Sequence, residues 1–158
     1  MVTAAPPSLQ QRFAPASRCF GCGPANELGL RLESRPGEDG LVATWMPATQ
    51  HEAFTGVLNG GIIGALLDCH SNWTAAWELM RRRGTDRPPV CVTADYHIRL
   101  VRPTPSDRPV TLSSRIVEST DKRAAVEATL SSDGGVTATC RGTFVAVGPD
   151  HPAHGSWD

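Results

Sequence analysis

Apolar residues are spaced most densely after Asn59, where they recur at the three- and four-residue intervals of a helix. No proline interrupts this run, and Ile62-Ile63 is its only β-branched pair. Asn59 is a suitable N-cap, and Gly84 is a suitable stop after the arginines that precede it. The pattern predicts one helix over 60–83, roughly 36 Å long. Because its first half is apolar on most of its circumference, we expect it to be buried.

Alternating apolar and polar residues predict strands on both sides of this helix. Before it, 28–33 and 41–45 are separated by a Pro-Gly-Glu-Asp-Gly turn and are typical of a β-hairpin. After it, Asp133-Gly134-Gly135 predicts a tight turn between the last two of four strands. These four strands are expected at 90–100, 110–119, 123–131 and 136–147.

This order of elements predicts an α+β fold with an antiparallel sheet wrapped around one long central helix. One sheet edge would remain free to pair with a second subunit. The 158 residues fit a single domain. We expect a flexible N-terminal segment over 1–17, the folded domain over 18–148 and a flexible C-terminal tail over 149–158.

Composition and charge narrow the possible partners. Hydrophobic residues make up 40% of the chain and the formal net charge is -1, so no basic field favours nucleic acid. No stretch approaches the roughly 20 apolar residues of a membrane span, and the first residues lack the apolar part of a secretory signal. Five cysteines are too sparse for a disulfide scaffold. We therefore expect a cytoplasmic protein without membrane or nucleic-acid partners.

One acidic residue in the predicted helix is a candidate for chemistry. Asp68 is the only charged residue between Glu52 and Glu78. An unpaired carboxylate in a buried helix is costly. Asp68 is therefore either hydrogen-bonded to a strand or part of a functional site.

Several motifs together resemble one known family. They are Cys19-Phe20-Gly21-Cys22-Gly23, Gly29-Leu30, Gly56-Val57-Leu58-Asn59-Gly60-Gly61, Ala65-Leu66-Leu67-Asp68, and Val92-Thr93-Ala94-Asp95 running to Arg102-Pro103. Spread over about residues 19–147, they resemble the hot-dog-fold acyl-CoA thioesterases of the PaaI-like type. The resemblance implies a hot-dog fold that hydrolyses an acyl-CoA to free acid and CoA without a cofactor. It also implies a homodimer, possibly a dimer of dimers, with active sites completed between subunits.

The resemblance assigns roles to residues at the helix start and on the helix. The backbone amide of Gly60 would polarise the thioester carbonyl, since N–H groups at a helix start lack helical partners. Glycine at Gly60 and Gly61 lets an acyl group approach the backbone. Asp68 would act as general base or nucleophile, facing the helix start of the partner subunit. Thr93 occupies the place of a family Ser/Thr that helps to hold the attacking water.

The chain departs from the family pattern at two positions. Asn59 stands where the family usually carries a histidine, and Ala53 where it usually carries an asparagine. Asn59 caps the helix, and its side-chain amide can also donate a hydrogen bond to the thioester. These departures keep open a non-catalytic acyl-CoA binding domain as a second function.

Further candidates for substrate contact lie near the helix start and on the helix. His51 and Phe54 lie in the loop that leads to the helix. His70 follows Asp68 by two positions, about 200° round the helix, so the two side chains should face apart. A hot-dog enoyl-CoA hydratase or dehydratase needs a histidine facing an acid, and His51 or His70 would have to serve.

Cys19 and Cys22 have the spacing of half a zinc site. No second Cys-x-x-Cys pair follows, and the other three cysteines, Cys69, Cys91 and Cys140, are isolated in the sequence. The resemblance favours a turn that lines the acyl pocket without a metal. We therefore expect no metal site.

Overall fold

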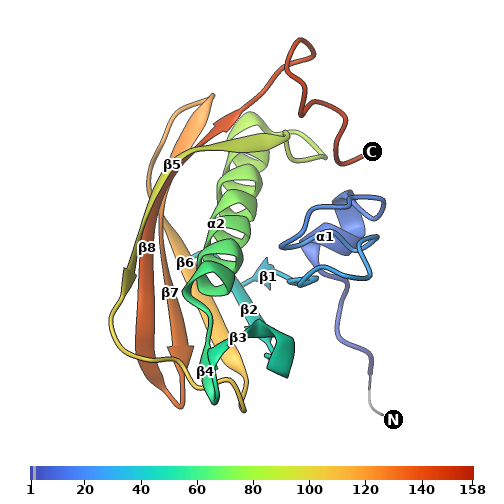
Figure 1. The fold of residues 1–158 in the computed structure, drawn as a ribbon. Helices are drawn as coiled ribbons and strands as arrows, with labels where there is room; N and C mark the ends of the chain where they lie inside the picture. Colours follow the sequence, from blue (N-terminus) through green and yellow to red (C-terminus); the bar gives the residue numbers. More distant parts are fainter. Residues whose placement is uncertain (2) are drawn as a thin grey trace.

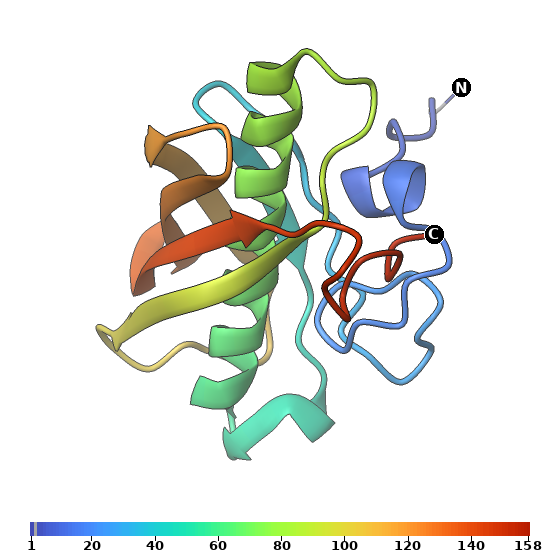
Figure 2. The same ribbon diagram turned by 90° about the horizontal axis from the view of Figure 1, so that it is seen from above.

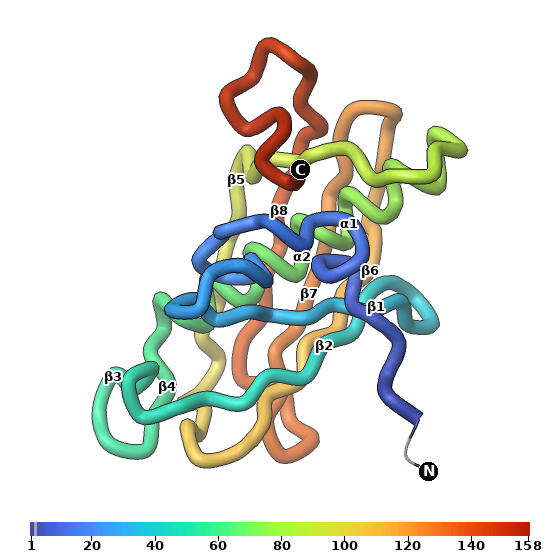
Figure 3. The backbone as a smooth tube through the Cα atoms, turned by 90° about the vertical axis from the view of Figure 1, so that its right-hand side faces the viewer, coloured from blue at the N-terminus to red at the C-terminus, as the bar shows by residue number. Residues whose placement is uncertain are grey.

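The computed structural model describes residue 1 and residues 3–158 and shows three layers (Figure 1). A curved sheet forms one side, the long helix α2 (Gly60–Arg83) lies against it, and residues 3–34 cover the other side of the helix. Figure 3 shows this N-terminal segment, which contains the short helix α1 (Leu9–Phe13), crossing in front of α2. The predicted sheet wrapped around one helix is confirmed.

The sheet has six antiparallel strands in the order β1-β2-β6-β7-β8-β5. Their bounds are β1 (Arg35–Pro36), β2 (Leu41–Trp45), β5 (Cys91–Leu100), β6 (Val110–Ser119), β7 (Arg123–Ser132) and β8 (Gly135–Ala146). The four long strands agree with the sequence prediction to within one residue at each end. The turn at Asp133-Gly134 has positive φ at both residues (52° and 76°), as a two-residue hairpin requires. Strand β5 lies at one edge of the sheet (Figure 2).

Helix α2 begins and ends where the sequence predicts. The Asn59 side-chain oxygen accepts hydrogen bonds from the amides of Gly61 (2.7 Å) and Ile62 (3.2 Å), and Gly84 closes the helix with φ of 65°. Along its length the helix packs on the sheet through Leu66, which is fully buried, and other apolar side chains. Among the described residues, no helix has both the length and the apolarity that crossing a membrane requires.

Residues 8–14 pack against the domain, unlike the flexible segment expected over 1–17, whereas residues 3–7 are exposed. Ser8 and Gln11 form a capping box for α1, and Leu9 and Phe13 are 2% and 5% exposed in the main core. The buried Gln10 side chain accepts a hydrogen bond from the Ser34 amide at 2.9 Å. Two apolar side chains on one short helix are enough to bury it against the domain.

The C-terminal residues also make a specific contact. The Trp157 ring stacks on Trp73 of α2 with ring centres 4.1 Å apart and planes 9° from parallel. Trp73 itself is 2% exposed. The expectation of a flexible tail over 149–158 therefore does not match the packing of its last turn.

The predicted strand over 28–33 is absent. The amides of Leu30 and Leu32 donate to the carbonyls of Phe20 (2.7 Å) and Gly21 (3.0 Å), so this segment pairs with the Cys-x-x-Cys turn. The short strand that pairs with β2 on this side is Arg35–Pro36. The loop expected before the helix holds a 3-10 turn (Thr49–His51) and a small hairpin of β3 (Glu52–Phe54) and β4 (Val57–Leu58).

His70 belongs to the interior of the domain. Its side chain is 0% exposed; Nε2 lies 3.1 Å from the Leu41 carbonyl and Nδ1 lies 2.8 Å from Ser34 Oγ. Because a carbonyl only accepts, Nε2 carries the proton and Nδ1 accepts from the serine hydroxyl. Both ring nitrogens are thus occupied, so the expectation that His70 contacts a substrate is not met.

Replacing Gly84 with alanine should destabilise the protein, because a Cβ strains a backbone held at positive φ. We expect a loss of about 1 kcal/mol in the free energy of unfolding, measured by urea denaturation. Gly148→Ala is the matched control, since its φ is not positive and no atom lies within 4 Å of the added Cβ. Equal stabilities for the two variants would contradict the left-handed cap.

Stability should fall in mild acid because of His70. Burial lowers the pKa of His70 from 6.5 to about 4, with the Leu41 carbonyl opposing the shift. The unfolded chain then binds the proton more readily than the folded chain. The stabilisation from neutral His70 is therefore complete above pH 6.5, and up to about 3 kcal/mol of the free energy of unfolding is lost as the pH falls toward 4. His70→Gln retains a donor for Leu41 but does not titrate, so its urea midpoint should depend less on pH. An identical pH dependence in both proteins would refute this assignment.

Candidate active site

The Asp68 carboxylate opens onto a cavity of about 590 Å³. The cavity lies where α2, the first residues of β5, the Cys-x-x-Cys turn and the C-terminal residues meet. Its walls include Cys19, Cys22, Asp68, Asn72, Thr93 and Trp157. The predicted acid is therefore next to a space that can hold a ligand.

Thr93 on β5 is the hydrogen-bond partner of Asp68. Its hydroxyl donates to Asp68 Oδ1 at 2.7 Å. No ion pair or strand amide engages the carboxylate within the part of the chain described. Burial raises the pKa of Asp68, the Thr93 hydrogen bond opposes the rise, and the charge of Cys19 adds to it. The structure thus brings together Asp68 and Thr93, two of the predicted site residues.

The start of α2 presents one free backbone donor. Asn59 Oδ1 takes the amides of Gly61 and Ile62, and the Asn59 carbonyl takes that of Ile63 at 3.1 Å. The amide of Gly60 has no acceptor among the described residues. The Asn59 cap thus uses the inner amides and leaves the outermost one available. A Cβ on Gly60 would lie 2.9 Å from Cδ1 of the exposed Leu100 side chain at the end of β5, so any larger residue would require that side chain to move.

His51 and Phe54 lie beside this helix start. The His51 carbonyl accepts from the Asn59 amide at 2.9 Å, and its ring Nδ1 accepts from the Ala48 amide at 3.0 Å. Burial lowers the pKa of His51, and its ring centre lies 4.9 Å from that of Trp45. Phe54, at the end of β3, is 66% exposed.

The predicted residues therefore form two separate groups in one chain. Asp68 and Thr93 form one, and Asn59, Gly60 and Gly61 form the other. Eight residues of helix separate Asp68 from Gly60, about 12 Å at 1.5 Å per residue. The two groups of one chain cannot act on the same carbonyl carbon.

Sequence reasoning missed Cys69 and Trp157. The Sγ atoms of Cys69 and Cys19 are 3.7 Å apart, although the two residues are far apart in the chain. The position of Cys69 directly after Asp68 was the available signal. Trp157 could not be found by spacing, because only its stacking on Trp73 brings it to the cavity.

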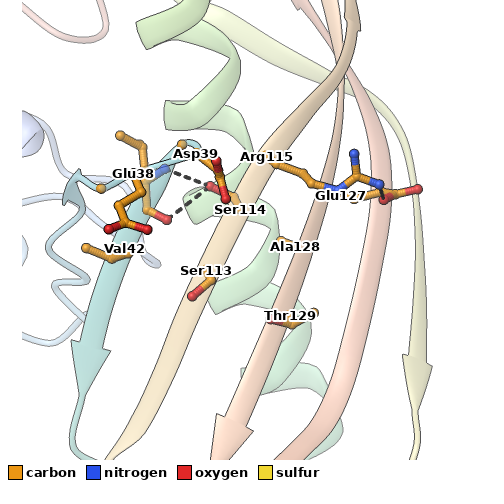
Figure 4. Close-up of a pocket in the computed structure, with 12 residues that line it drawn as sticks. Glu38, Asp39, Val42, Ser113, Ser114, Arg115, Glu127, Ala128 and Thr129 are labelled. Atoms are coloured by element: carbon orange, nitrogen blue, oxygen red, sulfur yellow. Dashed lines mark hydrogen bonds and ion pairs between the residues drawn. The ribbon is translucent and has the colours of Figure 1, made fainter.

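A second cavity of about 560 Å³ lies on the outer face of the sheet (Figure 4). Glu38, Asp39 and Val42 border it near β2, and Arg115 of β6 forms an ion pair with Glu127 of β7 there. None of the predicted site residues lines it. The cavity that contains Asp68 is the better candidate.

Comparison with known proteins identifies the family and the fold of the chain. No curated protein matches the sequence. Among solved structures, the chain is similar to a thioesterase superfamily protein from Shewanella loihica PV-4, with 28% identity, a TM-score of 0.64, and coverage of 74% of this chain and 91% of that one.

Two further solved structures share the fold. One is a putative thioesterase, phenylacetic acid degradation-related, from Ralstonia eutropha JMP134 (19% identity, TM-score 0.62, 74% and 86% covered). The other is a hypothetical thioesterase protein with coenzyme A from Streptococcus pneumoniae TIGR4 (18% identity, TM-score 0.61, 74% and 86% covered). The model of the thioesterase-like superfamily matches residues 44–150, more than half of the chain, and covers both Asp68 and the helix start. The chain thus belongs to the thioesterase-like superfamily and has its hot-dog fold.

Proposed function

We propose that this protein hydrolyses an acyl-CoA thioester to free acid and CoA in an active site shared by two subunits. The proposal rests on Asp68, a partly buried carboxylate at the wall of a 590 Å³ cavity whose single hydrogen-bond partner among the described residues is Thr93. Membership of the thioesterase-like superfamily supports the reaction class. The coenzyme A in the Streptococcus pneumoniae structure supports the choice of thiol.

Asp68 supplies the group that starts the reaction. Thr93 binds Oδ1, and Oδ2 accepts no hydrogen bond from the described residues. The free oxygen either takes a proton from an attacking water or attacks the carbonyl itself. Both roles need the ionised carboxylate near neutral pH, and the Thr93 hydroxyl favours that form against the effect of burial.

The Gly60 amide supplies the second group, a donor to the carbonyl oxygen. It lies at the positive end of α2, where negative charge developing on oxygen is stabilised. Asn59 holds the neighbouring amides, and its Nδ2 makes no hydrogen bond within the described residues. The side-chain amide is therefore a further donor toward the thioester, in the place where the family usually has a histidine.

A second copy of the chain brings the two groups together. Strand β5 is an edge strand of ten residues, and Tyr96 and Leu100 on it are 47% and 58% exposed. Gly60 contacts Leu100, so the helix start lies beside this edge. Pairing of β5 with β5 of a second subunit buries these side chains and sets each Asp68 across from the other chain's Gly60.

Replacing Asp68 with asparagine should lower kcat by at least about 100-fold, because the amide neither takes a proton nor attacks. Release of free thiol from short, long and aromatic acyl-CoAs measures this. Thr93→Val should lower kcat in part, because it removes the hydrogen bond that holds the Asp68 carboxylate. Thr93→Ser keeps the hydroxyl and should retain more of the rate. Asp86→Asn, in the exposed loop after α2, is the matched control.

Three results would contradict the proposal. Undiminished hydrolysis by folded Asp68→Asn would remove the proposed acid. Hydration of an enoyl-CoA without thiol release would indicate a hydratase. Tight acyl-CoA binding without thiol release would indicate a binding domain.

Asn59→Asp separates capping from catalysis. Aspartate caps a helix as well as asparagine does, so the free energy of unfolding should stay within about 0.5 kcal/mol of wild type. Its negative charge opposes the oxyanion, so we expect kcat/KM to fall about 10-fold or more. Asn59→His, which introduces the usual family residue, should leave hydrolysis similar or raise it. Unchanged kcat/KM in Asn59→Asp would show that the side chain only caps the helix.

A further inference from the structure

Three thiols from distant parts of the chain converge beside Asp68. Cys19 and Cys22 lie in the Cys-x-x-Cys turn of the N-terminal segment, and Cys69 lies on α2. Their sulfur atoms all lie within 4.8 Å of one another. We call these three residues the thiol cluster. All three border the cavity that Asp68 enters.

The spacing of the sulfurs suits one shared metal ion. Zinc–thiolate bonds of about 2.3 Å in a tetrahedron place two sulfurs roughly 3.8 Å apart. Cys19 Sγ and Cys69 Sγ are 3.7 Å apart. A disulfide would require about 2.05 Å. Little movement is needed for the cluster to surround an ion.

Glycines make this close approach possible. A Cβ on Gly21 would lie 2.4 Å from Cys69 Sγ, and one on Gly23 would lie 2.4 Å from the Cys19 backbone nitrogen. Neither position has space for any side chain. The turn is thus shaped to bring its two cysteines onto Cys69.

A hydrogen-bond donor lies beside the cluster. The Trp73 indole N–H donates to Cys22 Sγ at 3.4 Å. Such a donor stabilises a thiolate, which is the form in which cysteine binds a metal ion.

We propose that Cys19, Cys22 and Cys69 bind one zinc ion as thiolates, with a water molecule from the adjoining cavity as fourth ligand. Binding releases the thiol protons of the three cysteines to solvent and leaves a net charge of -1 on the ion and its three sulfurs. Zinc prefers such soft sulfur ligands in tetrahedral geometry. The ion links the N-terminal segment to the turn of α2 that carries Asp68. This assignment does not depend on thioester hydrolysis.

Metal content and cobalt binding test the proposal on the full-length protein. Protein purified under reducing conditions should contain about one zinc per chain by elemental analysis. After removal with a chelator, titration with Co²⁺ should give the near-ultraviolet thiolate-to-cobalt absorption, saturating at one ion per chain. Cys19→Ser, on the exposed turn, should abolish this absorption or weaken Co²⁺ affinity at least 10-fold.

Cys140→Ser is the matched control, because this buried cysteine of β8 lies outside the cluster. It should bind Co²⁺ like wild type. Cys69→Ser repeats the test from the helix side, with circular dichroism to confirm folding. The absence of a thiolate-to-cobalt band in the folded wild-type protein would overturn the proposal. So would equal Co²⁺ affinity in Cys19→Ser and wild type, or a disulfide between cluster cysteines in protein purified under reducing conditions.

Discussion

The burial of α2 on two opposite sides is the constraint on which the structure depends. The sheet covers one side and the N-terminal segment covers the other, so a polar side chain on this helix must find its partners inside the protein (Figure 1). His70 finds two and becomes part of the core. Asp68 has one hydrogen-bond partner among residue 1 and residues 3–158, the Thr93 hydroxyl, and its second carboxylate oxygen accepts no bond from them at the cavity. Asp68 and His70 lie two positions apart, and they differ in the number of hydrogen-bond partners that the surrounding packing supplies. This number makes His70 a structural residue and leaves Asp68 available for chemistry.

Local patterns predicted the elements whose partners adjoin them in the sequence. Helix α2 was found from end to end because the Asn59 cap, the apolar periodicity and Gly84 all lie within it. The β7–β8 hairpin was found because its turn residues specify it. Residues 28–33 were assigned wrongly, since their hydrogen-bond partners are in the Cys-x-x-Cys turn and not in the following strand. Leu9 and Trp157 were missed for the same reason. Each is an apolar residue in a mostly polar segment, and each packs against residues that are distant in the sequence.

The candidate site was predictable to a similar extent. Asp68 was identified by its isolation in an apolar helix, and Thr93 and Gly60 by family resemblance. The structure pairs Asp68 with Thr93, and the Gly60 amide has no acceptor in the part of the chain that the structure describes. The thiol cluster was not predictable from spacing, because zinc motifs are recognised as pairs and Cys69 is single. Only the fold of the N-terminal segment over α2 makes it the third member. Sequence spacing therefore predicted candidate residues within single helices and turns. It did not predict the thiol cluster, which forms only when the N-terminal segment packs on α2.

The distance of about 12 Å along the helix between Gly60 and Asp68 has a consequence for dimers that contain two different mutant chains. In the proposed dimer each chain lends its acid to one site and its helix start to the other. A mixed pair in which one chain lacks the acid and the other lacks a working helix start would still contain one complete site. A pair with both defects in the same chain would contain none. Two individually inactive proteins that exchange subunits can therefore form mixed dimers with half the activity of a wild-type dimer, whereas one doubly defective chain inactivates both sites of the dimer it forms with an intact chain.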